Sequence, residues 1–299
     1  MKAAFSVLAM ITFTAITISG CAGAATATSA PTQLPTAAPA TKAPDATATK
    51  PAATLAPTTS PATATSAPAS TGKIKIYYGG NAMVELVSPD GMRVMVDVYN
   101  PQALSSPATA NDILLTTHTH GDHINKDFLN TFPGKQLYVK TGNLQAGSVK
   151  VTGIAAGHNS GDKPQPENGT DYIYLIEMNG LRIAHFGDLG QDALTPEQLT
   201  ALGKVDIAVM QFENSYSAMD AVNKKGFNMM NQVKPRLIIP THINTASVKL
   251  LGETWQTLYT EKAFISVGAG ELAGDIKVVF MGSKAKSWAE LAKAALADW

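Results

Sequence analysis

Residues 113–123 read ILLTTHTHGDH, and the rest of the sequence is best interpreted outward from this stretch. Its first four residues are a short apolar run, which is typical of a buried strand. Histidines follow almost at once, at positions 118 and 120. Side chains two residues apart in an extended chain point the same way, so His118 and His120 are expected to face a common point.

The turn after these histidines completes a cluster of metal-ligating side chains. Gly121 is expected to allow a sharp turn, which brings Asp122 and His123 back toward the two preceding histidines. Three imidazoles and a carboxylate within six residues form a cluster typical of metal ligands. The alternative is a solvated polar loop.

Further candidate ligands follow predicted strands later in the chain. His158 comes after a strand at about 148–154, Asp188 ends a strand, and His242 follows a strand at 237–239. Residues at strand ends sit on a rigid scaffold, where functional side chains are often found. These three residues are therefore expected to join the 118–123 cluster.

Hydrophobic alternation and turn residues predict a mixed α/β domain. The expected strands are 73–78, 83–87, 92–98, 113–116, 136–140, 148–154, 171–178, 181–186, 205–210, 237–239 and 276–281. The expected helices are 126–130, one that begins after Thr195 as N-cap, 219–233, and an amphipathic closing helix at 285–298. Strands interleaved with helices indicate either two sheets with helices outside or a doubly wound sheet.

The amino-acid composition argues against several classes of partner, substrate and metal site. The 299 residues carry 23 Lys and Arg against 23 Asp and Glu, so the net charge is zero. This balance argues against a nucleic-acid partner, and no protein partner is evident. Only three arginines occur, which favours neutral or acyl substrates over polyphosphates. The single cysteine, Cys21, excludes a disulfide framework and a cysteine-ligated metal site.

The N-terminal region is expected to be an export signal and a tether. Residues 1–20 are predicted to be a signal peptide that ends in a segment resembling the lipobox of bacterial lipoproteins. That resemblance implies lipidation of Cys21 and an extracytoplasmic protein anchored to a bacterial lipid bilayer; an ordinary secretory signal is the alternative. Residues 21–72, rich in Ala, Thr and Pro, predict a disordered tether. The folded domain is then 73–299.

The motifs of this domain resemble those of the metallo-β-lactamase superfamily and occur in that superfamily's order. The likeness covers most of 73–299 and is greatest toward predicted metal-dependent hydrolases and lactonase-like members. Besides residues 117–123, it rests on residues 78–82, 96–97, 217–220 and 234–242.

The resemblance implies a fold and a ligand set. The implied fold is a four-layer αβ/βα sandwich with two divalent metal ions at the strand ends. By that pattern seven residues hold the ions: His118, His120 and His158 the first, Asp122, His123 and His242 the second, and Asp188 both. Members often have a histidine where this chain has Asn81, so an auxiliary role of that histidine is not carried over.

The ligand set predicts hydrolysis of a small-molecule substrate. Two divalent ions would share a water as a bridging hydroxide that attacks an ester, lactone, amide or phosphodiester. Asp122 is also a candidate catalytic residue that orients the hydroxide or takes its proton. Zn2+ suits a mixed histidine and carboxylate set best, with Mn2+ or Fe2+ as alternatives. A domain without cysteine excludes a true β-lactamase site of the cysteine-containing type.

A non-catalytic metal-binding lipoprotein with the same ligands is the alternative function. Such a scavenger would need only one closed site, whereas a bridging carboxylate favours catalysis. Bound-metal stoichiometry separates the two functions.

Three further assignments depend on weaker signals. His185 is a candidate catalytic residue that binds substrate or donates to an oxyanion, and the alternative is a core histidine bonded to the backbone. Asp97 ends an early strand and is expected to accept the second N–H of a ligand histidine, if it is not an ordinary turn carboxylate. The polar loop at 211–216 is expected either to line the pocket or to face solvent.

Overall fold

A computed structural model describes residues 72–164 and 169–282. The predicted signal peptide, the predicted lipidation at Cys21, nearly all of the tether and the closing helix at 285–298 lie outside these residues. These assignments, and the domain boundaries that depend on them, stay predictions.

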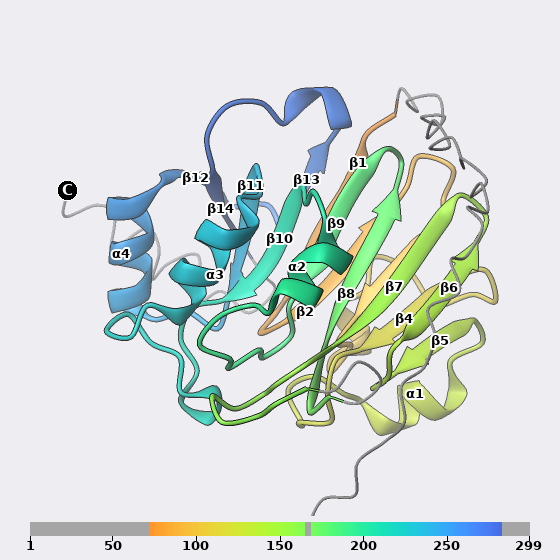
Figure 1. The fold of residues 1–299 in the computed structure, drawn as a ribbon. Coiled ribbons are helices and arrows are strands. Elements are labelled where there is room, and N and C mark those ends of the chain that lie inside the picture. The colour runs from red at the N-terminus through yellow and green to blue at the C-terminus, as the bar shows by residue number, and fades with distance from the viewer. Residues whose placement is uncertain (1–71, 165–168, 283–299) are drawn as a thin grey trace, which may run out of the picture. The chain divides into compact units, whose positions relative to one another are not determined.

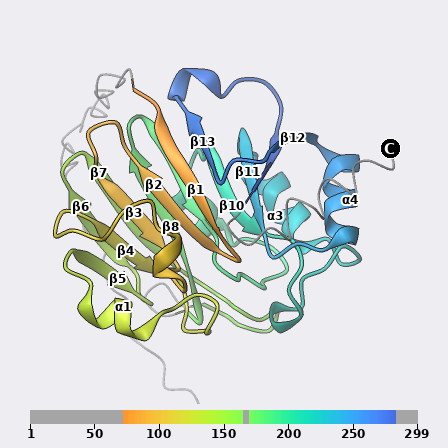
Figure 2. The same cartoon turned by 180° about the vertical axis from the view of Figure 1, so that it is seen from behind.

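The strands form two sheets, which Figures 1 and 2 show from opposite sides. The six-stranded sheet has the order β13-β1-β2-β3-β4-β5, with bounds Phe264–Val267, Ile74–Gly80, Met83–Val87, Arg93–Val96, Ile113–Thr116 and Lys135–Tyr138. The eight-stranded sheet has the order β12-β14-β11-β10-β9-β8-β7-β6, with bounds Gln256–Thr260, Lys277–Met281, Leu237–Thr241, Ile207–Gln211, Leu181–His185, Asp171–Met178, Val149–Ala156 and Gly142–Ala146.

Helices lie on the outer faces of both sheets. The helix α1 covers the six-stranded sheet, and α2, α3 and α4 lie along the eight-stranded sheet (Figure 1), with bounds Lys126–Thr131, Pro196–Leu202, Lys225–Val233 and Thr245–Thr254. Short 3-10 turns η1, η2 and η3 occupy Pro101–Ala103, Ser215–Ser217 and Ala269–Glu271. Thr195 caps α2 as expected, in a reciprocal capping box with Gln198.

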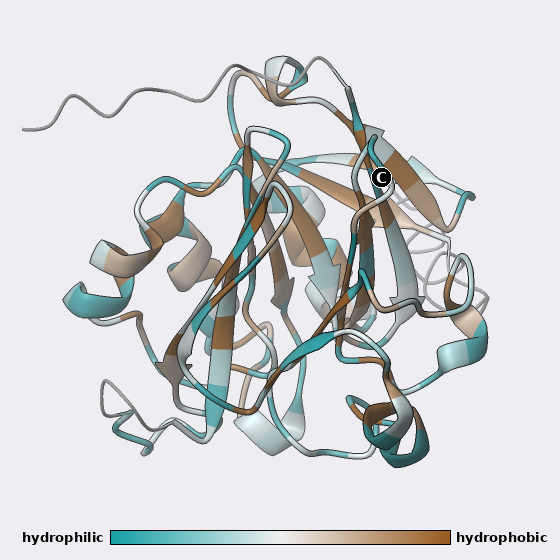
Figure 3. Cartoon of the chain, turned by 90° about the vertical axis from the view of Figure 1, so that its right-hand side faces the viewer, coloured by the Kyte–Doolittle hydropathy of each residue, from teal (hydrophilic) through white to brown (hydrophobic). Residues whose placement is uncertain are grey.

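Alternation along the strands explains the layers. In β10, Ile207 and Val209 join the core between the two sheets, whereas Ala208 and Met210 join the core beneath the helices. Leu114 of β4 belongs to a third core on the outer face of the six-stranded sheet. Strands buried on both faces have continuous apolar sequences, and Figure 3 shows brown, hydrophobic residues along them. The four-layer αβ/βα sandwich is therefore confirmed.

Strand direction places several strand ends at one edge of the sandwich. β3 and β4 are parallel, as are β9, β10 and β11. β7 runs in the same direction as β9, because both pair antiparallel with β8. The carboxyl ends of β7, β9 and β11 thus share an edge of the eight-stranded sheet, and β8 begins there.

The expected helix over 219–233 is wrong at its start. The helix α3 begins only at Lys225, and residues 220–224 form a turn. The Asp220 side chain accepts from the backbone N–H groups of Val222 and Asn223, each at 2.7 Å. Such side-chain bonds offer the backbone an alternative to helix. The structure also contains α4 and strands β6, β12 and β13, which were not expected from the sequence.

Among the described residues, no helix is both long enough and apolar enough to cross a membrane.

Candidate metal centre

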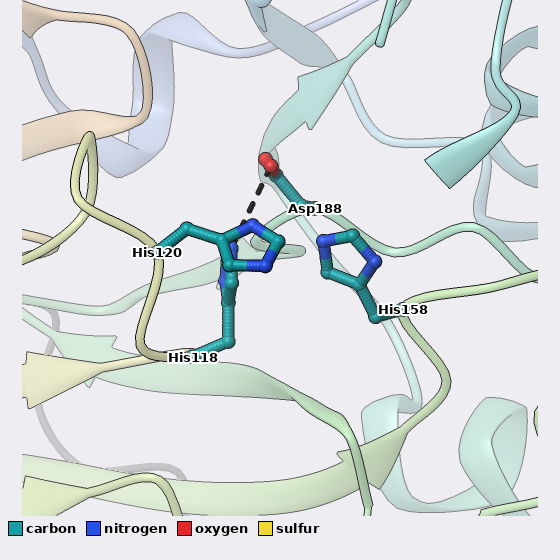
Figure 4. A group of neighbouring side chains, drawn as sticks. All are labelled: His118, His120, His158 and Asp188. Carbon is teal, nitrogen blue, oxygen red and sulfur yellow. Dashed lines mark ion pairs between the residues drawn. The ribbon is translucent and has the colours of Figure 1, made fainter. Parts of the chain in front are cut away.

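The seven side chains predicted as ligands lie at this edge in two groups. The first group is His118, His120, His158 and Asp188, and the second is Asp122, His123 and His242. Within each group the potential ligand atoms lie within 4.8 Å of one another. Figure 4 shows the first group, with the three imidazole rings gathered beneath the Asp188 carboxylate. Residues up to 124 positions apart, from 118 to 242, are thus brought together.

Asp188 lies between the two groups. Its Oδ1 atom is 3.2 Å from His123 Nε2 and 3.1 Å from His242 Nε2, both in the second group. Its Oδ2 atom is 3.7 Å from His118 Nε2 in the first group. One carboxylate oxygen therefore faces each group, which is the arrangement of a bridging ligand.

Asp122 lies at the edge of the second group. Its Oδ2 atom is 3.9 Å from His123 Nε2 and 4.0 Å from His242 Nε2. The side chain is 43% exposed, whereas that of His123 is wholly buried. Asp122 is therefore a ligand candidate that also reaches solvent.

The atoms that face the space between these residues lack partners. Five buried ligand atoms make no hydrogen bond: His118 Nε2, His123 Nε2, His158 Nε2, His242 Nε2 and Asp188 Oδ1. Unpartnered buried polar atoms are rare and costly in folded proteins. Divalent cations would give each of these atoms a partner, and imidazole with carboxylate is a donor set that such cations bind. The residues present thus fit the metals that the superfamily pattern implies.

Asp97 lies directly behind His123, in the position expected from the sequence. Its Oδ2 atom is 2.9 Å from His123 Nδ1, which leaves His123 Nε2 facing the other ligands. Asp97 Oδ1 accepts from the backbone N–H of Thr117 at 2.8 Å. Asp97 and His242 both have positive φ angles, 52° and 41°, in a region that residues other than glycine seldom adopt. Strain of this kind gathers at functional sites.

Charges within the site shift the pKa values of its members. Burial opposes a charge on His123, but Asp97 and Asp188 outweigh it and hold the pKa of His123 well above its usual value. Burial also opposes a charge on Asp188, yet the imidazoles of His123 and His242, at 3.2 and 3.1 Å from Oδ1, favour the carboxylate and bring the pKa of Asp188 well below its usual value. The carboxylates thus favour positive charge at the second group.

A polar network from the 211–216 loop fixes Asp188. Asn214 Nδ2 donates to Asp188 Oδ2 at 2.7 Å and to Gln211 Oε1 at 2.9 Å. Gln211 Nε2 in turn donates to the Leu189 carbonyl oxygen at 2.9 Å. Gln211 is wholly buried, so this part of the loop turns inward rather than facing solvent. The sequence marked the loop as polar but could not show that Asn214 holds a ligand.

With this geometry established, comparison with known proteins assigns the family. The profile of the β-lactamase superfamily domain matches residues 75–242, more than half of the chain. The chain belongs to this superfamily. The match ends at the last predicted ligand, His242, and includes the other six.

Curated relatives of this chain carry hydrolase names. A UPF0173 metal-dependent hydrolase from Thermococcus onnurineus is 27% identical over 199 residues, which cover 58% of this chain and 85% of that protein. One from Pyrococcus abyssi is 25% identical over 224 residues, covering 65% and 96% respectively. The predicted likeness to metal-dependent hydrolases agrees with these names, and the lactonase-like placement stays a prediction.

A crystal structure from Thermotoga maritima has a similar fold. That protein, of the metallo-β-lactamase superfamily and proposed to be a Zn-dependent hydrolase, superposes with a TM-score of 0.51 at 20% identity. The match covers 70% of this chain and 98% of that one. At this identity the likeness supports the fold alone.

His185 does not fit the catalytic role expected for it. Its ring Nε2 is 2.8 Å from the Ala82 carbonyl oxygen, and its Nδ1 accepts from the Gly187 N–H at 3.2 Å. The side chain is buried, and burial lowers its pKa. Both ring nitrogens are thus used by the backbone, which agrees with the alternative of a core histidine.

The turn at Gly121 also differs from expectation. A backbone bond from His123 N–H to the His120 carbonyl oxygen, 3.0 Å long, closes the turn. Gly121 has no positive φ angle, and a Cβ atom there would meet nothing within 4 Å. The turn therefore forms without the conformational freedom of glycine.

A cavity of about 350 Å³ opens beside the first group. Its lining residues are His118, Thr119, His120, Val139, His158, Asn159, Thr170 and Tyr216. The Tyr216 ring lies 6.1 Å from that of His120, and the side chain is 78% exposed. No lysine or arginine is among these lining residues, so within the described part of the chain the cavity wall brings no fixed cation to a substrate.

Proposed function

We propose that this protein is a dinuclear metal-dependent hydrolase that acts on an ester, lactone, amide or phosphodiester of modest size. The observation that carries the proposal is the position of Asp188, whose two oxygens face two separate groups of ligand atoms. A single closed site would not need a carboxylate shared in this way.

Charge balance supports two divalent ions rather than one. Four carboxylates lie at or directly behind the ligand groups: Asp97, Asp122, Asp171 and Asp188. Their four negative charges match the four positive charges of two divalent ions. Five histidines among the seven ligand candidates favour Zn2+, with Mn2+ or Fe2+ as alternatives, because imidazole suits zinc and iron better than magnesium or calcium.

The chain's own residues would then orient and activate the reaction. When bound, a pair of divalent ions lowers the pKa of water to near neutrality and polarises the bond to be cleaved. Asp188, which accepts a hydrogen bond from Asn214, would contact both ligand groups and so fix their positions relative to each other. Asp122 is partly exposed at the edge of the second group, so its carboxylate is placed to accept a proton and pass it to solvent.

The cavity beside the first group supports a neutral substrate with an apolar part. Its wall combines three imidazoles with Val139 and the ring of Tyr216. An exposed aromatic ring next to a ligand histidine offers a face for an apolar or planar substituent. The absence of lysine and arginine among the described lining residues disfavours a polyphosphate.

Anchoring at a bacterial membrane is part of the same proposal. It depends on the position of Cys21 after an apolar N-terminal run. Replacing Cys21 with Ala should move the protein from the membrane fraction to the soluble fraction of cells. A variant that stays with the membrane would contradict lipidation.

The function is tested with generic substrates. The purified protein would be assayed on p-nitrophenyl esters, lactones, amides and bis(p-nitrophenyl) phosphate, with and without a chelator. Turnover should appear on at least one class, vanish with chelator and return with Zn2+. Asp188→Ala should reduce kcat by at least about a thousandfold. Asn143→Ala, on the exposed edge strand β6, is the matched control and should not change turnover.

The alternative, a non-catalytic metal-binding lipoprotein, predicts a different result. Such a protein would hold one inert ion per chain and would turn over none of the four substrate classes. Two bound ions with chelator-sensitive turnover support the hydrolase.

A further inference from the structure

Asp171 is a buried carboxylate outside the predicted ligand set. It is the first residue of β8, paired with Ala156 of β7, at the edge where the ligand groups lie. The residue is wholly buried, and neither carboxylate oxygen has a hydrogen-bond partner. A buried carboxylate without partners is expensive unless positive charge lies close to it.

The nearest group that can carry positive charge is a ligand histidine. Asp171 Oδ1 lies 3.5 Å from His118 Nδ1. The hydroxyl of Thr117 is 3.1 Å from the same nitrogen and donates its proton to Asp97 Oδ2 at 2.8 Å. Since that proton is already used, the Thr117 oxygen is an acceptor toward His118. Both neighbours of Nδ1 are therefore acceptors, which places the ring proton on Nδ1 and leaves Nε2 free to bind a cation.

The turn before Asp188 is shaped around the same carboxylate. A Cβ atom on Gly187 would lie 2.5 Å from Asp171 Oδ1 and 2.8 Å from the Thr117 Cβ atom. Gly187 also has a φ of +53°, which side chains rarely adopt. Because Gly187 has no side chain, it leaves room for Asp171 beside His118. Gly187 is also the residue directly before Asp188, the bridging carboxylate.

We propose that Asp171 is a positioning residue for the first ligand group. Its charge, 3.5 Å from His118 Nδ1, favours the ring proton on that nitrogen and lies behind the cation that His118, His120, His158 and Asp188 would hold. The inference rests on the proposed function only in that a cation binds at this group; it adds a residue outside the ligand set.

The test measures metal binding and metal-free stability together in the full chain. Asp171→Asn keeps the shape of the side chain and removes its charge. Zn2+ affinity would be measured by competition with a chromophoric chelator, and thermal unfolding would be followed after metal removal. We expect the affinity of one ion to fall by about 10- to 100-fold and that of the other to change less than about twofold. The metal-free variant should unfold at the same or a higher temperature, because an uncompensated buried charge is gone.

Asp97→Asn is the matched control, because Asp97 contacts His123 of the second group at 2.9 Å. His120→Ala, which removes a first-group ligand, identifies the ion that Asp171→Asn weakens. Asp97→Asn should weaken the other ion. The proposal would be overturned if Asp171→Asn left both affinities unchanged, or if it lowered the unfolding temperature of the metal-free protein without selective loss of one ion.

A second measurement covers the case in which Asp171→Asn does not fold. In the Zn2+-loaded wild-type protein, nitrogen NMR of the histidine rings should show His118 protonated at Nδ1 and shielded from exchange. A His118 ring without that proton would overturn the proposal. A wild-type protein that binds no metal would overturn this proposal and the proposed function together, whereas normal binding with an unaffected Asp171→Asn variant would overturn this proposal alone.

Discussion

At the scale of single residues, the centre depends on side chains that hold the ligands in place. Asn214 donates to Asp188 Oδ2 at 2.7 Å and is itself held by Gln211. Asn214→Ala should weaken metal binding by about 10- to 100-fold, as is typical when a group that orients a ligand is lost. Chelator competition measures this, with Asn143→Ala on β6 as control. Equal affinities in the two variants would contradict the role of Asn214.

Two glycines near the ligands should respond differently to the same substitution. Gly187→Ala places a methyl group against Asp171 and Thr117 at a positive φ angle, so it should lower the unfolding temperature and reduce metal binding. Gly121→Ala meets open space without a positive φ, so stability should stay within about 0.5 kcal/mol of the wild type. Urea unfolding of both variants tests this prediction. A larger loss of stability in Gly121→Ala than in Gly187→Ala would contradict it.

At the scale of elements, a side chain of β8, in the eight-stranded sheet, is hydrogen-bonded to the six-stranded sheet near the end of β4. The Tyr174 hydroxyl donates to the Thr116 carbonyl oxygen at 3.0 Å and lies 3.2 Å from that of Leu137. Tyr174→Phe removes these bonds and should lower the free energy of unfolding by about 1 to 3 kcal/mol. Tyr77→Phe keeps its ring contact with Phe264 and serves as control in the same urea titration. A Tyr174→Phe variant as stable as the control would contradict this account.

Local sequence patterns predicted the elements where one signal dominated. Alternating apolar residues predicted β8 and β9, and Thr195 with the following proline predicted the start of α2. The helix expected from 219 was wrong because Asp220 bonds its own turn, a competition that apolar spacing does not show. The exposed edge strands β6 and β12 escaped prediction because few of their side chains are buried.

The metal centre, too, could be predicted from the sequence only in part. His118, His120, Asp122 and His123 stand close together in the sequence, so their convergence could be predicted from spacing. The grouping of His158, Asp188 and His242 came from the family resemblance and strand order. Asp171 and Asn214 could not be found in advance, because each acts on a residue of a different element and neither stands in a recognisable motif.

At the scale of the whole molecule, binding of metal should displace protons. The pKa of His123 lies well above its usual value despite burial, because Asp97 and Asp188 favour its charged form. In the metal-free site, His123 therefore keeps its ring proton above about pH 6.5, where a free histidine titrates. Metal binding must release this proton, so metal affinity rises with pH. Calorimetry at pH 8 in buffers of different ionisation enthalpy should detect a net release of protons on metal binding.

Asp97→Asn provides the control for proton release. It removes a charge that raises the pKa of His123, so the variant should release less of a proton at pH 8 than the wild type. Equal heats in all buffers for the wild-type protein would contradict the predicted coupling.

The most direct measurement is the metal content of the purified chain after exhaustive dialysis, by inductively coupled plasma mass spectrometry. We expect about two divalent ions per wild-type chain, because Asp188 joins two ligand groups. His120→Ala in the first group and His242→Ala in the second should each retain about one. A wild-type chain that holds one ion or none, or variants that lose nothing, would contradict it.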